Sequence, residues 1–154
     1  MKVALIGLGS VGRGIAGMIA KKDLGLTITG IADSKTGLID NRGIDVQKVL
    51  ASKKKTGVCG NAGITAADVI QKAEYDALIE VTPTNALSGE PATGYIRAAL
   101  DRKKHVVTSN KGPVALHYKE LKALAQKNGV AFRYEATVAG AVPIMHTLEH
   151  GLAG

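Results

Sequence analysis

The chain has 154 residues, of which 45% are hydrophobic and 21% charged, and this suits one folded domain with a core of its own. It contains four Tyr, one Phe and no Trp, and this scarcity of aromatic residues argues against stacking platforms for single-stranded nucleic acid. The single cysteine, Cys59, excludes an intramolecular disulfide and any metal site built from several cysteines. A reducing, cytoplasmic setting fits this composition.

The formal net charge of +7 has two interpretations. Basic residues can bind nucleic acid, or they can attract phosphate and carboxylate groups to the sites of an enzyme. The basic residues are scattered along the chain without a helix-turn-helix or RNA-binding signature, which favours the second interpretation. No apolar run is long enough to span a bilayer, and the first one meets Gly7 too early for a signal peptide. We expect neither a nucleic-acid partner nor a membrane.

A glycine motif near the amino terminus carries the first functional signal. Residues 3–6 predict a short strand, residues 11–21 predict a helix, and the segment between them fits G-x-G-x-x-G. In this context the motif predicts a dinucleotide site, because its glycines permit a tight turn, a close pyrophosphate and close helix packing. The helix N-terminus attracts phosphate as well, and the alternative is an ordinary glycine-rich turn. The motif residues are Gly7, Leu8, Gly9, Ser10, Val11 and Gly12.

The second predicted strand, residues 26–32, ends at an acidic residue, Asp33. This position lies about 20 residues beyond the glycine motif, where a carboxylate accepts hydrogen bonds from the adenosine ribose of NAD. Lys35, which follows Ser34, can instead pair with the additional phosphate of NADP, so the choice between NAD and NADP stays open. The alternative role of Asp33 is that of a turn residue ahead of Ser34 and Lys35.

The next segment predicts connecting structure. Residues 36–42 predict a polar loop, residues 45–51 a short amphipathic helix, and residues 53–63 a loop that is basic at first and then rich in glycine. Lys53, Lys54 and Lys55 are interpreted as a solvated edge, with a phosphate contact as the alternative. Cys59 is expected to be inert.

Thr65 predicts a helix N-cap, with Asp68 three residues later as a variant of the capping box, and this helix is expected to end near residue 73. Residues 77–81, ALIEV, are nearly all apolar and predict a strand buried on both faces. Loops at the carboxyl ends of parallel strands form the ligand crevice of such sheets. Thr82 and Asn85 are therefore candidates for hydrogen bonds to ribose or nicotinamide, although plain turn residues have the same pattern.

A further helix is predicted over residues 90–103 and a further strand around residues 106–107. The strand leads into Ser109, Asn110 and Lys111, and Pro113 suits the first turn of a helix that ends at Gly129. Lys111 thus lies between a strand end and a helix start, inside the predicted crevice. Most lysines are solvated surface charges, but this one is placed to donate to a substrate oxygen.

The last part of the chain predicts a strand over residues 130–134, irregular structure over residues 135–143, and an apolar helix over residues 144–152. His146 and His150 share one face of that helix, but without H-E-x-x-H or an evident third ligand we do not expect a metal there. Strands and helices alternate throughout. This order predicts an α/β fold, a Rossmann-type doubly wound and mostly parallel sheet with helices on both faces.

Several stretches together resemble homoserine dehydrogenase. They match its nucleotide-binding half in order and spacing, and the resemblance covers the whole chain. Besides the glycine motif they are Glu80–Thr82, Thr108–Pro113, Glu135–Val138 and Pro143–Ile144. The resemblance implies NAD(P)-dependent oxidation of L-homoserine to L-aspartate 4-semialdehyde, a reversible hydride transfer in threonine and methionine biosynthesis.

The resemblance also implies roles for single residues. Lys111 matches the crevice lysine that serves catalysis and substrate binding. A monovalent cation, sodium or potassium, is implied at backbone oxygens of Glu135, Val138, Gly140 and Val142, and Gly140 is expected near the cofactor as well. The sequence departs from the common Gly-Ala-Gly of the family here, since it has Ala-Gly-Ala at residues 139–141.

The family continues into a second domain that carries the homoserine site and most of a homodimer interface. We therefore expect an NAD(P)-binding domain at residues 1–142 and, at residues 143–154, the start of a helix that links to a catalytic domain absent from this chain. The chain alone is expected to bind cofactor but to turn over poorly. Three rivals remain: another two-domain amino-acid or semialdehyde dehydrogenase, a non-catalytic nucleotide-sensing module, and a nucleic-acid binder.

Overall fold

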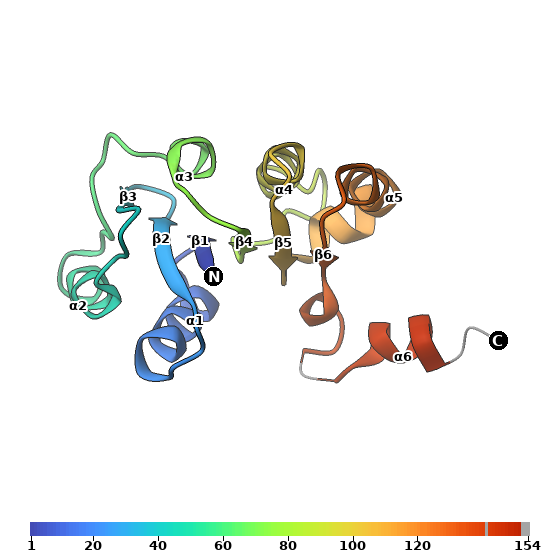
Figure 1. Ribbon diagram of the computed structural model, residues 1–154, viewed down its shortest axis with the longest axis horizontal. Helices are drawn as coiled ribbons and strands as arrows, with labels where there is room; N and C mark the ends of the chain where they lie inside the picture. Colours follow the sequence, from blue (N-terminus) through green and yellow to red (C-terminus); the bar gives the residue numbers. More distant parts are fainter. Residues whose placement is uncertain (141, 152–154) are drawn as a thin grey trace.

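The structure, a computed structural model, describes residues 1–140 and 142–151, apart from the side chains of residues 149 and 150. The described residues form a six-stranded sheet with the strand order β3-β2-β1-β4-β5-β6. Adjacent strands are parallel except β2 and β3, which are antiparallel. Helices α3, α4 and α5 lie on one side of the sheet and α1 and α2 on the other (Figure 1). The predicted fold class is confirmed.

The elements follow one another along the chain much as the alternating pattern predicts. Their bounds are β1 Lys2–Ile6, α1 Ser10–Lys21, β2 Thr27–Ala32, β3 Gly37–Ile39, α2 Val46–Thr56, α3 Ala66–Lys72, β4 Ala77–Glu80, α4 Ala92–Asp101, β5 His105–Thr108, α5 Lys111–Asn128, β6 Phe132–Arg133, the 3₁₀ turn η1 Glu135–Thr137 and α6 Ile144–Gly151. No helix in the described ranges is both long and apolar enough to cross a membrane.

The sheet separates two hydrophobic clusters, because alternate residues of a strand face opposite sides. Ala4 and Ile6 of β1 pack with α3, α4 and α5 on one face, while Val3 and Leu5 pack with α1 and α2 on the other. All four side chains are almost fully buried. Burial on both faces explains why β1 and β4 are continuous apolar runs in the sequence.

The prediction of a polar loop over residues 36–42 is wrong for its first part. Gly37–Ile39 form the edge strand β3, which pairs with β2 through Gly30 and Ile39. The strand is too short and its flanks are too polar to produce an alternating pattern, so a strand could not be predicted there. Gly37 also exchanges backbone hydrogen bonds with Asn61 at 2.8 and 3.1 Å, which holds the following loop against this edge.

The helix predicted over residues 45–51 continues to Thr56, so the predicted loop begins too early. Asp45 caps it by accepting from the Lys48 amide at 3.1 Å, and Gly57 ends it in the left-handed conformation. Lys53, Lys54 and Lys55 form its last turn, where cations are favourable beside the helix C-terminus. A lysine run looks like a solvated loop in the sequence, yet lysine is a good helix former.

The start of α3 follows the prediction. Thr65 and Asp68 form a complete capping box, in which each side chain accepts a hydrogen bond from the backbone amide of the other. Two backbone amides at the N-terminus of this helix, those of Thr65 and Asp68, therefore have side-chain acceptors.

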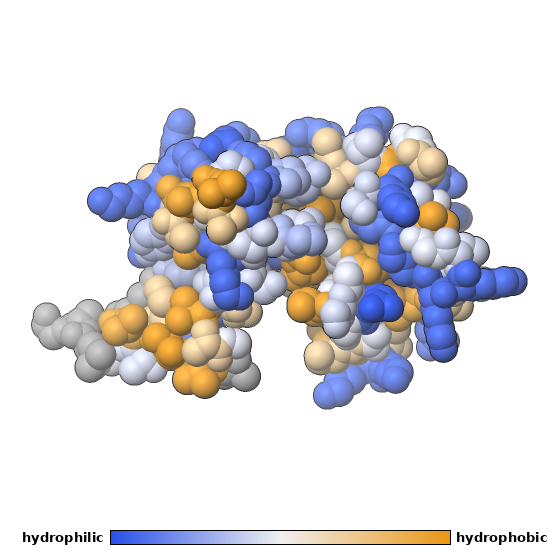
Figure 2. All heavy atoms as spheres, turned by 180° about the vertical axis from the view of Figure 1, so that it is seen from behind, coloured by the Kyte–Doolittle hydropathy of each residue, from blue (hydrophilic) through white to orange (hydrophobic). Residues whose placement is uncertain are grey.

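Helix α6 projects from the sheet at the end of the described chain (Figure 1). Glu135 accepts from the amides of Met145 and His146, each at 3.0 Å, and so caps this helix. Met145 packs against the core, whereas Leu148 is 49% exposed. Apolar side chains gather on this projecting part of the surface (Figure 2). The apolar helix expected over residues 144–152 is thus partly uncovered, and Leu152 of that range lies outside the described residues.

Candidate cofactor-binding crevice

The central strands end at one level, so the loops that follow them meet at one edge of the sheet. Ile6 pairs with Ala32 on one side and with Glu80 on the other, and Glu80 pairs with Thr108. The backbone continues this register, since the Ser109 amide donates to the Glu80 carbonyl at 3.3 Å. The glycine motif, Asp33, Thr82 and Lys111 therefore lie along one edge, as the carboxyl ends of parallel strands predict.

The glycine turn has the shape that the motif predicts. Gly7 has φ +102°, and a Cβ on it would lie 2.7 Å from the Val81 carbonyl carbon, so a side chain is excluded. A Cβ on Gly12 would collide with the Gly7 carbonyl oxygen, which shows how closely α1 packs on the turn. A Cβ on Gly9 would meet nothing within 4 Å. Gly9 therefore borders open space in front of the helix.

The N-terminus of α1 is free to bind an anion. Among the described residues no side chain caps its first turn, and that turn contains no acidic residue. Gly9, Ser10 and Val11 are exposed, while Leu8 is buried in the core. Uncapped amides with a positive helix end are the features that hold phosphate.

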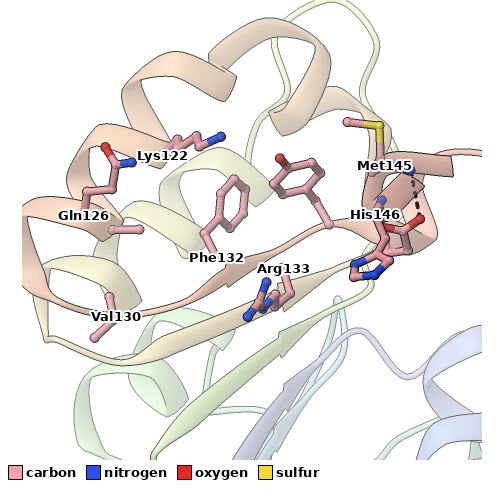
Figure 3. A pocket seen from close by; sticks show the side chains of 10 residues that line it. Lys122, Gln126, Val130, Phe132, Arg133, Met145 and His146 are labelled. Carbon is pink, nitrogen blue, oxygen red and sulfur yellow. Dashed lines mark hydrogen bonds between the residues drawn. The ribbon is translucent and has the colours of Figure 1, made fainter. Parts of the chain in front are cut away.

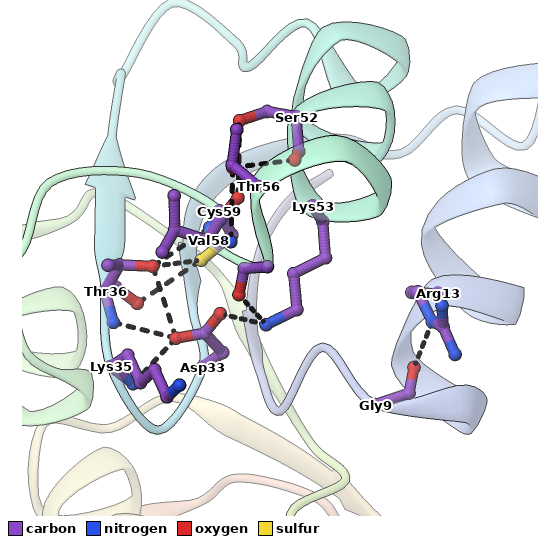
Figure 4. A network of polar contacts seen from close by, with 11 residues as sticks. Gly9, Arg13, Asp33, Lys35, Thr36, Ser52, Lys53, Thr56, Val58 and Cys59 are labelled. Carbon is purple, nitrogen blue, oxygen red and sulfur yellow. Dashed lines mark hydrogen bonds and ion pairs between the residues drawn. The ribbon is translucent and has the colours of Figure 1, made fainter.

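Asp33 lies at the end of β2 and is already bound on both carboxylate oxygens (Figure 4). Oδ1 accepts from the amides of Lys35 and Thr36, each at 2.7 Å, which is the turn role considered as its alternative. Oδ2 accepts from Lys53 Nζ at 2.5 Å, and the Asp33 side chain is only 5% exposed. Burial would raise the pKa of Asp33, but the hydrogen bonds from Lys53 and from the two amides lower it to about 2.

The interpretation of Lys53 as part of a solvated edge is wrong. Its side chain is 20% exposed, and its ammonium donates to the Gly57 carbonyl at 2.7 Å as well as to Asp33. Lys54 and Lys55 are exposed, as are Ser34 and Lys35. The buried position of Lys53 was not predicted, because its partner Asp33 lies 20 residues away in sequence. A run of three lysines also does not indicate which one of them is buried. Nearby Cys59 is buried, and burial raises the pKa of its thiol.

Asn85 has the turn role considered as its alternative, whereas Asn110 has a structural role that was not predicted. Asn85 Oδ1 accepts from the amides of Leu87 and Ser88 at 3.0 and 3.2 Å and so shapes its own loop. Asn110 is 2% exposed; its Oδ1 caps α5 through the Gly112 amide at 3.2 Å, and its Nδ2 donates to the Thr82 carbonyl at 3.1 Å. Asn110 therefore joins two loops of the crevice from inside.

Glu80 was not predicted as a site residue, although it lies at the centre of this loop network. It is fully buried, and its carboxylate accepts from Thr82 and Thr108. The one available signal is a carboxylate inside the apolar run ALIEV. Lys111 follows Asn110 as the first residue of α5 and is exposed toward solvent.

A cavity of about 470 Å³ lies between α5, β6 and α6 (Figure 3). Lys122, Phe132 and His146 are among its lining residues, but none of the predicted cofactor residues is. Its wall includes Glu135, whose carboxylate is bound to α6. The cavity is therefore separate from the crevice at the strand ends.

The stretch implied to hold a monovalent cation is partly described. The carbonyls of Glu135 and Val142 accept from the amides of Val138 and Ile144 at 3.3 and 2.8 Å. Gly140 has φ +60°, and residue 141 lies outside the described chain. Within the described ranges no three His, Cys, Asp or Glu side chains group as metal ligands, and the His150 side chain falls outside those ranges.

Comparison with known proteins agrees with the fold and shows the family. A sequence profile of the NAD-binding domain of homoserine dehydrogenase matches residues 7–135. The NAD(+)-dependent homoserine dehydrogenase of Pseudomonas canavaninivorans is 42% identical over 99% of this chain and 47% of its own length. The structure of a putative homoserine dehydrogenase from Archaeoglobus fulgidus superposes with a TM-score of 0.88 at 36% identity, covering 99% of this chain and 48% of that protein.

A hyperthermophilic archaeal homoserine dehydrogenase in complex with NADPH superposes with a TM-score of 0.80 at 28% identity, over 96% of this chain and 47% of that protein. The chain thus spans about half the length of the relatives that it matches. The profile match covers the glycine motif and every strand after β1. The chain belongs to the homoserine dehydrogenase family and corresponds to its NAD-binding domain.

Proposed function

We propose that the chain binds NAD or NADP along the edge where β1 and β4 end. The strand order runs from β1 to β2 in one direction and from β1 to β4 in the other, so the edge between β1 and β4 is the switch point where such sheets bind ligands. The pyrophosphate would lie over Gly9 and the open N-terminus of α1. The adenosine would extend toward Asp33, and the nicotinamide toward Thr82, Ser109 and Lys111.

The observation that carries this proposal is the open space at Gly9 beside uncapped amides. A helix N-terminus without a side-chain cap leaves donors that need a partner, and a diphosphate supplies acceptors of the matching charge. The relatives agree with it, because one is named NAD(+)-dependent and another was solved with NADPH.

The residues around Asp33 can bind the adenosine end of either NAD or NADP. Asp33 Oδ1 already accepts from two amides, but Oδ2 accepts only from Lys53 Nζ among the described residues, so its second lone pair can accept from a ribose hydroxyl of NAD. In NADP the 2′-phosphate would meet the ammonium groups of Lys53 and exposed Lys35 beside that carboxylate.

We propose that the whole enzyme interconverts L-homoserine and L-aspartate 4-semialdehyde. The cofactor, when bound, supplies hydride transfer between its nicotinamide and the carbon that bears the substrate oxygen. The Lys111 ammonium is placed to stabilise the charge that develops on that oxygen and to exchange its proton. Since the relatives are about twice as long as this chain, the substrate wall opposite Lys111 would come from a further domain.

Assembly as a cytoplasmic homodimer and a bound monovalent cation belong to the same proposal. The partly uncovered face of α6, with Leu148 exposed, supports a contact with a further domain or a second subunit. For the cation, the carbonyls of Glu135 and Val142 each keep a second lone pair after the hydrogen bond they accept.

The test of cofactor binding is titration calorimetry with NAD⁺ and NADP⁺ on wild type, Gly9→Val and Gly14→Val. Gly9→Val should abolish binding, because its side chain would fill the space proposed for the pyrophosphate. Gly14→Val is the matched control: Gly14 is also exposed, and a Cβ on it also meets nothing within 4 Å. Unchanged affinity in Gly9→Val, or equal loss in both variants, would contradict the proposed site.

A further inference from the structure

Glu80 is a buried carboxylate that has no ion-pair partner among the described residues. The side chain is 0% exposed at the end of β4, and none of the ion pairs in the described part of the chain includes it. Burying a charge without a cation is costly unless hydrogen bonds replace the lost water. The neighbours of Glu80 in the strand are apolar, so packing alone would favour an apolar side chain here. Its role is therefore to be sought in its hydrogen bonds.

All of those hydrogen bonds are donated by Thr82, in the loop after β4, and by Thr108, the last residue of β5. Oε1 accepts from the Thr82 amide at 2.8 Å and from Thr82 Oγ1 at 2.5 Å, and Oε2 accepts from Thr108 Oγ1 at 2.8 Å. Thr108 Oγ1 in turn accepts from the Asn110 amide at 3.0 Å. One carboxylate thus joins the loop after β4 to the end of β5 and, through Thr108, to the loop that follows β5.

This arrangement determines whether the Thr82 hydroxyl can donate or accept a hydrogen bond on the side of the crevice. Its hydrogen points to Glu80, and one of its lone pairs receives Asn110 Nδ2 at 3.3 Å. What remains toward the crevice is a lone pair, because a hydroxyl has one donor and two acceptor positions. The partly buried Thr82 can therefore accept from a ligand but cannot donate to it.

The same network fixes the start of α5. Asn110 is held by Thr108 at its amide and by the Thr82 carbonyl at its Nδ2, and its Oδ1 holds the Gly112 amide. Lys111 lies between these two bound residues. Its backbone position is thus set through Asn110 by the carboxylate of Glu80.

We propose that Glu80 is a positioning residue for the nicotinamide riboside end of the cofactor. It keeps Thr82 Oγ1 as an acceptor for an N–H or O–H of that end, and it holds the loop that carries Lys111. The inference rests on the proposed cofactor site and adds a residue that acts only through Thr82, Thr108 and Asn110.

The experiment measures NAD⁺ and ADP binding to the 154-residue chain by calorimetry. ADP keeps the adenosine and both phosphates but lacks the nicotinamide riboside. Glu80→Gln replaces one acceptor oxygen with a donor, so one of the two threonine hydroxyls must turn its hydrogen away. We expect NAD⁺ binding to weaken about tenfold, or about 1.4 kcal/mol, while ADP binding stays within about twofold. A general loss of structure would weaken both ligands alike.

Glu74→Gln is the control, because it makes the same chemical change on an exposed carboxylate paired with Lys2. Circular dichroism reports whether Glu80→Gln folds. If it does not fold, Thr82→Val and Thr82→Ser test the same role. Thr82→Val should weaken the binding of NAD⁺ but not of ADP, whereas Thr82→Ser, which keeps the hydroxyl, should bind NAD⁺ as wild type does.

The outcomes separate the two proposals. If wild type binds neither ligand, the cofactor site itself is wrong. If wild type binds both and Glu80→Gln weakens them equally or not at all, or if Thr82→Val binds NAD⁺ as wild type does, Glu80 has no positioning role.

Discussion

Replacing Asp33 with Asn removes the charge from a carboxylate that is 5% exposed and bound to Lys53 at 2.5 Å. Burial alone would raise the pKa of Asp33, but the hydrogen bonds from Lys53, Lys35 and Thr36 outweigh it and lower the pKa from 3.8 to about 2. Since the pKa is lower in the folded chain, the unfolded chain takes up the proton first as the pH falls. The charged carboxylate therefore stabilises the fold above about pH 4, and this contribution is lost as the pH falls through about 2.

The size of the effect follows from the shift. One pKa unit corresponds to about 1.4 kcal/mol, so a shift from 3.8 to about 2 corresponds to about 2 kcal/mol of unfolding free energy. We expect Asp33→Asn to be less stable than wild type by about this amount at pH 5.5, and the gap to close between about pH 4 and pH 2.

Urea denaturation at several pH values between 5.5 and 2 measures this gap. Other carboxylates also titrate in that range, so the quantity to follow is the difference between the two proteins at each pH. Asp101→Asn, at an exposed position at the end of α4, serves as the control and should show a small difference throughout. A gap for Asp33→Asn that keeps its size down to pH 2 would refute the role of the charge.

Two further predictions concern function. Asp33→Ala should weaken NAD⁺ more than NADP⁺ in calorimetry, because the 2′-phosphate lacks the hydroxyl that Asp33 would bind and is repelled by its charge; equal losses would leave Asp33 with the turn role alone. A chain extended by its downstream sequence should oxidise homoserine much faster than the 154-residue chain, and Lys111→Met should lower kcat of the extended chain by about 100-fold. Equal turnover of the short and extended chains would contradict the two-domain argument.

Local features of this fold could be predicted because each is encoded within a few residues. The turn at Gly7 needs a residue without a side chain, and the box at Thr65 needs a partner three residues later. Strand β4 was recognisable because both of its faces are buried. In each case the residues that determine the local structure lie within that structure, so they can be recognised in the sequence.

The contacts that shape the crevice are long-range, and for this reason they were missed. Glu80 meets Thr108 across 28 residues, and Asp33 meets Lys53 across 20. No spacing rule links such pairs, because the sheet order that joins them is known only after folding. Asn110 shows the same limit, since the sequence marks it as a crevice residue but not that its side chain is bound inside the protein.

The two ends of the crevice offer different hydrogen-bonding groups to a cofactor, because Thr82 and Asp33 are already hydrogen-bonded in different ways. At the proposed nicotinamide end the Glu80 network leaves an acceptor on Thr82, so a ligand donor would add a hydrogen bond and displace nothing. At the proposed adenosine end, Oδ1 of Asp33 already accepts from two amides, whereas Oδ2 accepts only from Lys53 among the described residues and keeps a second lone pair. A ribose hydroxyl would therefore share Oδ2 with Lys53, whereas a 2′-phosphate would bind the Lys53 ammonium and be repelled by the carboxylate. Selection between NAD and NADP should therefore depend on the pair of Asp33 and Lys53, and substituting either residue should change it.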